Sequence, residues 1–206
     1  MNEKSFLTIP KEIFFLETVV NKSRFLAYAT SAEKVEDAVD FLNSVRKKHY
    51  DATHNCYAYV VGNAVKFSDD GEPSGTAGKP ILNVLQQKGF CDVVVVVTRY
   101  FGGIKLGAGG LVRAYGGAAS DLLATVPVLK LTNCIDVEIL IHYNLLNAVV
   151  SVVSKYAIGY STDFDSEVKV TVSVKKEDVA QLLKAIENTT NGKANMTVGD
   201  EYIAKV

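Results

Sequence analysis

The residues best suited to chemistry lie in two glycine-rich segments, residues 67–80 and 98–117, on either side of a run of five valines. The valine run, residues 93–97, predicts a strand that is covered on both faces, because a continuous β-branched run is typical of a fully buried strand. Nine of the 15 glycines lie between Gly71 and Gly110. Glycine lets another group approach the backbone closely, so we expect a functional surface made largely of backbone amides.

The second segment has the features of an anion-binding site. Residues 107–110 are expected at the start of a helix over residues 108–124, and free amides at a helix N-terminus attract negative charge. Residues 93–120 contain three basic side chains and no acidic one. The candidate phosphate contacts are therefore Arg99, Lys105, Arg113 and the amides of Gly107, Gly109 and Gly110. The alternative is that these glycines only allow the helix to pack closely against the sheet.

Aromatic residues are interleaved with these cations. Tyr100 and Phe101 directly follow Arg99, and Tyr115 lies close after Arg113. Rings that stack on unpaired bases, combined with phosphate contacts, are typical of proteins that bind single-stranded RNA. Tyr100 is therefore a candidate stacking residue, although an aromatic residue at a strand end more often belongs to the core.

The first segment carries three acidic residues, Asp69, Asp70 and Glu72. Carboxylate oxygens are the ligands that Mg²⁺ prefers, so Asp69 and Asp70 form a candidate magnesium site. An Asp-Asp-Gly sequence also forms a turn without any ion, since aspartate side chains accept hydrogen bonds from the nearby backbone. A third interpretation is that the acids pair with Arg99 or Arg113 and hold the two segments together.

Known catalytic motifs fit the chain poorly. Residues 73–80 resemble a nucleotide phosphate loop but have prolines at its first and last positions, and proline cannot supply the amides that cradle phosphate. Val112 stands where a dinucleotide-binding loop needs its third glycine. His49, His54 and Cys56 lie close together in the sequence, but no second Cys/His pair is near enough to complete a zinc site. No convincing catalytic constellation results, and whether the chain is an enzyme stays open.

Composition indicates a folded protein of 206 residues, 48% of them hydrophobic. The net charge is −1, so the chain lacks the basic excess of many nucleic-acid binders. No apolar run approaches the roughly 20 residues of a membrane helix, and the first residues do not form a signal peptide. Three widely spaced cysteines favour reduced thiols over a disulfide framework. We therefore expect a cytoplasmic protein with no membrane partner.

Hydrophobic periodicity predicts an α+β chain of two domains, residues 1–130 and 131–206. In the first domain we expect strands at residues 14–20, 24–29, 55–61, 64–67 and 93–98. We also expect a helix capped by Ser31 that runs to about Lys48, a helix with Pro80 in its first turn that Gly89 ends, and a helix over residues 108–124. The second domain is predicted to have the βαββαβ order of a ferredoxin-like fold, with strands at residues 135–142, 159–164, 168–174 and 195–203 and helices at residues 145–156 and 177–187.

Residues 67–81 and 97–115 resemble the signature of the YigZ/IMPACT family, and residues 53–58 resemble it as well. The resemblance covers most of residues 10–125. It implies a first domain like the second domain of ribosomal protein S5, followed by the ferredoxin-like domain of bacterial members. It also implies a translation-linked regulator without established catalytic residues.

The leading hypothesis is a regulatory factor in translation that binds RNA or the ribosome through its second glycine-rich segment. One alternative is an enzyme or sensor that binds a nucleotide or another phosphorylated small molecule at the same segment. The other is a protein-interaction module in which the glycines are purely structural. The oligomeric state is not predicted.

Overall fold

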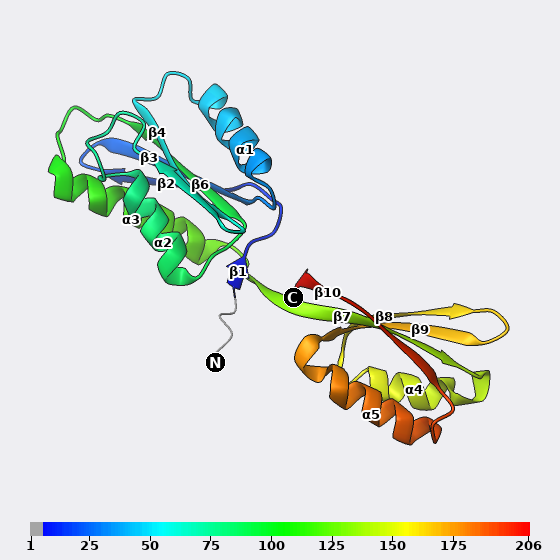
Figure 1. The fold of residues 1–206 in the computed structure, drawn as a ribbon. Helices are drawn as coiled ribbons and strands as arrows, with labels where there is room; N and C mark the ends of the chain where they lie inside the picture. Colours follow the sequence, from blue (N-terminus) through cyan, green and yellow to red (C-terminus); the bar gives the residue numbers. More distant parts are fainter. Residues whose placement is uncertain (1–5) are drawn as a thin grey trace. The chain divides into compact units, whose positions relative to one another are not determined.

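A computed structural model describes residues 6–206 and divides the chain into two compact units. The first unit reaches to Lys130 and the second comprises Leu131–Val206. Each unit consists of helices packed against an antiparallel sheet (Figure 1). The predicted α+β class is therefore confirmed.

The sheet of the first unit has the strand order β2-β3-β6-β4-β5, and every neighbouring pair is antiparallel. Its strands are β2 (Phe14–Val20), β3 (Ser23–Ser31), β4 (His54–Val61), β5 (Ala64–Ser68) and β6 (Val93–Tyr100). The helices are α1 (Val35–Lys48), α2 (Gly78–Lys88) and α3 (Gly107–Thr125). The short strand β1 (Phe6–Thr8) bonds through Leu7 to the backbone of Gly89 and Cys91.

Strand β6 lies at the centre of this sheet, with helix α1 on one face and helices α2 and α3 on the other (Figure 1). All five valines from Val93 to Val97 are fully buried, which confirms the predicted strand. Val94 and Val96 pack with the apolar side of α1, whereas Val93, Val95 and Val97 join the core beneath α2 and α3. This alternation follows from the pleat of a strand, and it fixes which side each residue at the end of β6 faces.

Most of the turns and helix ends predicted from the local sequence are found in the structure. The predicted hairpin is confirmed, since β2 and β3 are joined by a tight turn at Asn21 and Lys22, both with positive φ. Helix α2 ends at Gly89, which has φ of 74°. The prediction that Ser31 is a helix N-cap is wrong, because Ser31 still pairs with Val93 in the sheet and α1 begins at Val35 with Lys34 as its N-cap.

The second unit has the sheet order β10-β7-β9-β8, all antiparallel, with both of its helices in one apolar cluster with the sheet. Its elements are β7 (Leu129–Ile141), α4 (Leu146–Val153), β8 (Ala157–Phe164), β9 (Val168–Lys175), α5 (Val179–Thr190) and β10 (Asn195–Lys205), with single 3₁₀ turns at Tyr143–Leu145 and Lys176–Asp178. This confirms the βαββαβ order of a ferredoxin-like fold. None of the helices formed by residues 6–206 has both the length and the apolar character needed to cross a membrane.

Candidate functional site

The N-terminus of α3 is open to solvent. Gly107, Ala108 and Gly109 are exposed and Gly110 is half-buried. The capping position, Leu106, provides no side-chain hydrogen bond, and the first turn contains no acidic residue. The first amides of a helix lack partners within the helix, so this end presents unsatisfied donors to the solvent and favours an anion.

The glycines of this segment have different structural roles. At Gly102 a Cβ would lie 2.0 Å from the carbonyl carbon of Lys22, so only glycine lets the β2–β3 turn approach the backbone there. Gly107 has open space around it but a φ of +69°. At Gly109 a Cβ would meet only the guanidinium of Arg113, at 3.6 Å. Close packing therefore explains Gly102, but it does not explain Gly109.

Two of the predicted cations lie at or near this helix end. Arg113 is exposed, and its Nη1 atom is the group nearest the side-chain position of Gly109, so the guanidinium lies over the first turn of α3. Lys105 is exposed in the loop directly before the helix. Among residues 6–206 neither side chain forms an ion pair with an acidic group. Their charge is thus available to a ligand.

The structure places Arg99 inside the unit, apart from these two cations. Its side chain is 6% exposed, and its Nη1 donates to Glu72 Oε1 at 2.7 Å. The guanidinium also lies over the rings of Phe25 and Phe101, at 5.5 and 5.4 Å from the ring centroids. The interpretation that an acid of the first segment pairs with Arg99 is therefore confirmed for Glu72, and we leave Arg99 out of the proposed contact surface.

Glu72 is the centre of a buried polar network. The carboxylate oxygen that binds Arg99 also accepts from the hydroxyl of Tyr115 at 2.7 Å, and the other oxygen lies 3.8 Å from His54 Nε2. Burial raises the pKa of the Tyr115 hydroxyl and of the nearby Cys56 thiol, so both stay protonated at neutral pH. A protonated, buried thiol is a poor nucleophile, and the network joins the first segment to β6 and α3.

Asp69 and Asp70 bind the protein itself. Asp69 accepts from the amides of Gly75, Ala77 and Gly78 at 2.8–3.0 Å and so caps the start of α2. Asp70 accepts from Arg46 at 2.9 Å and from the amide of Asn55 at 2.7 Å. The interpretation that aspartate side chains accept from nearby backbone amides is confirmed for Asp69, whereas Asp70 binds residues that are distant in the sequence. The magnesium site stays a prediction, and residues 6–206 contain no group of three or more His, Cys, Asp or Glu side chains arranged to hold a metal.

Tyr100 faces the opposite side of β6 from Arg99. Its hydroxyl donates to Asp51 at 3.0 Å and lies 3.0 Å from His49 Nδ1, while His49 Nε2 lies 2.8 Å from the hydroxyl of Tyr28. Because the Tyr100 proton goes to Asp51, Nδ1–H of His49 donates to Tyr100, and Nε2 accepts from Tyr28. The structure therefore does not bring Tyr100 together with Lys105 and Arg113.

His49 should make stability depend on pH. Burial, aided by the charge of Lys48, lowers its pKa below the ordinary value of 6.5. Below pH 6.5 the unfolded chain binds a proton that folded His49 does not yet bind, so the free energy of unfolding falls as the pH drops below 6.5. The His49→Gln variant should lose less stability than the wild type over this range in urea titrations. Equal losses would contradict this role for His49.

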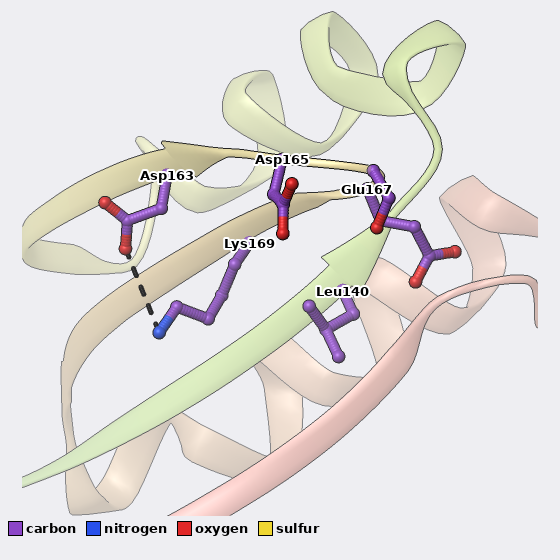
Figure 2. Close-up of a pocket in the computed structure, with 6 residues that line it drawn as sticks. Leu140, Asp163, Asp165, Glu167 and Lys169 are labelled. Atoms are coloured by element: carbon purple, nitrogen blue, oxygen red, sulfur yellow. Dashed lines mark ion pairs between the residues drawn. The ribbon is translucent and has the colours of Figure 1, made fainter.

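The second unit contains a hollow of a different character. It has a volume of about 340 Å³ and is lined by Leu140, Asp163, Asp165, Ser166, Glu167 and Lys169 (Figure 2). The single cation, Lys169, lies 3.8 Å from Asp163 and 3.7 Å from Glu138. The acidic side chains outnumber it, so this hollow does not suit an anion.

The fold and the site define a class of two-unit α+β proteins whose first unit exposes a glycine-rich, cationic helix N-terminus. The family model for the Impact N-terminal domain matches residues 21–123. The chain is 34% identical over 188 residues to the IMPACT family member YigZ of Escherichia coli, covering 88% of this chain and 92% of that protein. The chain therefore belongs to the IMPACT family.

Two further relatives agree with this assignment. The IMPACT family member YvyE of Bacillus subtilis is 48% identical over 129 residues, which cover 61% of this chain and 59% of that protein, under two thirds of its length. A crystal structure of a hypothetical protein with 33% sequence identity superposes with a TM-score of 0.61 and covers 94% of this chain and 97% of that one.

Proposed function

We propose that this IMPACT family protein is a regulatory factor in translation that binds RNA, free or in the ribosome, at the N-terminus of α3. The observation that carries the proposal is the exposed, uncapped first turn of α3 with the guanidinium of Arg113 over Gly109. Amide donors and an exposed cation at one helix end are suited to phosphate oxygens. Lys105 adds a second positive charge in the preceding loop.

The neighbouring acids do not oppose an anion there. Glu72 is neutralised by Arg99, and Asp70 by Arg46. The carboxylate of Asp69 is taken up by three amides at the start of α2. Two of the three acids of the first segment are therefore paired with arginines, whereas Lys105 and Arg113 form no ion pair among residues 6–206.

Exposure favours a long polyanion over a small phosphorylated ligand. Tight binding of a small molecule requires a concave site that buries most of its surface, whereas Gly107, Ala108, Gly109 and both cations are exposed. A nucleic acid can instead gain affinity from several phosphate contacts spread over a surface, each of which releases counterions.

The proposal predicts a change in salt dependence. The Lys105→Ala/Arg113→Ala variant should bind RNA more weakly than the wild type, and the slope of log affinity against log salt should become shallower by about 1.4, because each lost contact to single-stranded nucleic acid removes about 0.7. Fluorescence anisotropy with a labelled RNA between about 50 and 200 mM salt measures both quantities.

The matched control is Lys66→Ala/Lys88→Ala, which removes the same charge from exposed positions on β5 and at the C-terminus of α2. It should leave the slope close to that of the wild type. Equal slopes for all three proteins would reject phosphate contact by Lys105 and Arg113. A thermal shift with nucleotides or phosphometabolites, in a protein that does not bind RNA, would favour the enzyme or sensor instead.

A further inference from the structure

Two aromatic side chains at the end of the first sheet are largely exposed. Phe101, the first residue after β6, is 47% exposed, and Tyr50, which follows the C-terminus of α1, is 87% exposed. Tyr115, by contrast, is fully buried. Large aromatic residues at an exposed site are enriched where a protein meets a partner.

Hydrogen bonds place these two residues at the same end of the sheet. The amide of Phe101 donates to Thr53 Oγ1 at 3.0 Å, and the amide of Thr53 donates to the carbonyl oxygen of Arg99 at 2.9 Å. The loop that carries Tyr50 is thereby tied to the loop that carries Phe101 and Lys105. Figure 1 shows both loops at the end of the sheet where α3 begins.

Phe101 is held in place from behind. The guanidinium of Arg99 lies 5.4 Å from its ring centroid, and Arg99 is itself fixed by the ion pair with Glu72. One side of the ring therefore contacts a buried cation while about half of the residue remains open to solvent. A ring that is already positioned loses little conformational entropy when a flat ligand stacks on it.

The surroundings of both rings are cationic. Lys47 and Lys48 are exposed just before Tyr50, and Lys105 is exposed four residues after Phe101. One acid, Asp51, directly follows Tyr50 and accepts the hydrogen bond of the Tyr100 hydroxyl, so beside Tyr50 the two lysines outnumber the single carboxylate. Rings interleaved with cations suit a strand whose bases are unpaired, because bases inside a duplex are already stacked on one another.

We propose that the RNA bound by this protein is single-stranded at the site, and that Phe101 and Tyr50 stack on its bases while Lys105 and Arg113 bind its phosphates. This inference rests on the proposed function and specifies the form of RNA that the protein binds. It assigns stacking to Phe101 and Tyr50 in place of Tyr100, whose hydroxyl is fixed between Asp51 and His49.

The test compares one labelled RNA as a single strand and as a duplex with its complement. Phe101→Ala and Tyr50→Ala should each weaken binding of the single strand by between about fivefold and about 150-fold, the range for one stacked base, and leave the salt slope and the affinity for duplex unchanged. Phe15→Ala, which alters another half-exposed phenylalanine on β2, is the matched control and should leave both affinities unchanged.

A spectroscopic readout is independent of affinity. The chain contains no tryptophan but has 10 tyrosines, so Phe101→Trp introduces a single tryptophan at the proposed stacking position, and its emission can be excited selectively over that of the tyrosines. Single-stranded RNA should quench its emission and duplex should not, and this variant should keep the wild-type affinity because tryptophan also stacks.

The outcomes separate this inference from the proposed function. If Lys105→Ala/Arg113→Ala makes the salt slope shallower while Phe101→Ala and Tyr50→Ala bind the single strand like the wild type, phosphate binding stands and stacking is rejected. Equal affinity of the wild type for the single strand and the duplex also rejects stacking by Phe101 and Tyr50. Absence of binding to either RNA overturns both proposals.

Discussion

Replacing Glu72 with alanine should lower the free energy of unfolding of the first unit by about 3–5 kcal/mol, the range for removing one partner of a buried ion pair. The carboxylate is 4% exposed and binds both Arg99 and Tyr115. Its loss leaves the guanidinium buried without a counter-charge and the Tyr115 hydroxyl without its acceptor, and each unsatisfied group adds to the loss. Urea denaturation of the full chain measures the change.

The matched control is Glu17→Ala, which breaks the ion pair of Glu17 with Arg24 on the surface of the same sheet. Exposed pairs contribute little because water and salt screen them, so this variant should unfold close to the wild-type midpoint. A loss for Glu72→Ala no larger than that for Glu17→Ala would show that the network around Glu72 does not hold the glycine-rich segments together.

Replacing Asp69 with alanine should destabilise the first unit by about 2–3 kcal/mol, more than an ordinary helix cap and similar to the loss of charge-assisted hydrogen bonds. Three amides at the start of α2 would lose their shared acceptor. Asp69→Asn should lose less, because its amide oxygen can still accept from Ala77 and Gly78. Its NH₂ group would then face the amide of Gly75, so the variant should not equal the wild type.

Asp121→Ala, at an exposed position on α3, is the control and should change stability by no more than about 0.5 kcal/mol. The same proteins test the magnesium prediction. If Asp69 holds Mg²⁺, millimolar Mg²⁺ should raise the denaturation midpoint of the wild type and leave that of Asp69→Ala unchanged. If Asp69→Ala, Asp69→Asn and Asp121→Ala all unfold at the same urea midpoint, the capping role of Asp69 is rejected.

Local patterns predicted most of the fold because they depend on near neighbours. The run Val93–Val97 indicated a strand buried on both faces, and Gly89 marked the end of α2. Ser31 misled because a serine next to a helix can also be the last residue of a strand, and only its pairing with Val93 decides between the two.

The site was only partly predictable because its key contacts join distant residues. Glu72 meets Arg99 across 27 positions and Tyr115 across 43. The sequence predicted an ion pair between the two segments as one interpretation, but it could not show that Arg99 is buried while Lys105 and Arg113 are exposed. Nothing in the sequence around Phe101 and Tyr50 shows whether their rings are exposed or packed. The sequence alone therefore gave no reason to prefer them to Tyr100 as stacking residues.

The most direct test of RNA binding at α3 is a nitrogen–proton correlation spectrum of the ¹⁵N-labelled protein, recorded while a short single-stranded RNA is added. We expect the largest chemical-shift changes for the amides of Gly107, Ala108 and Gly109 and for the side-chain N–H groups of Arg113. The signals of the residues around the hollow at Lys169 should not shift. Binding that leaves Gly107–Gly110 unshifted, or that shifts only residues of the second unit, would contradict the assignment of this helix end as the RNA contact.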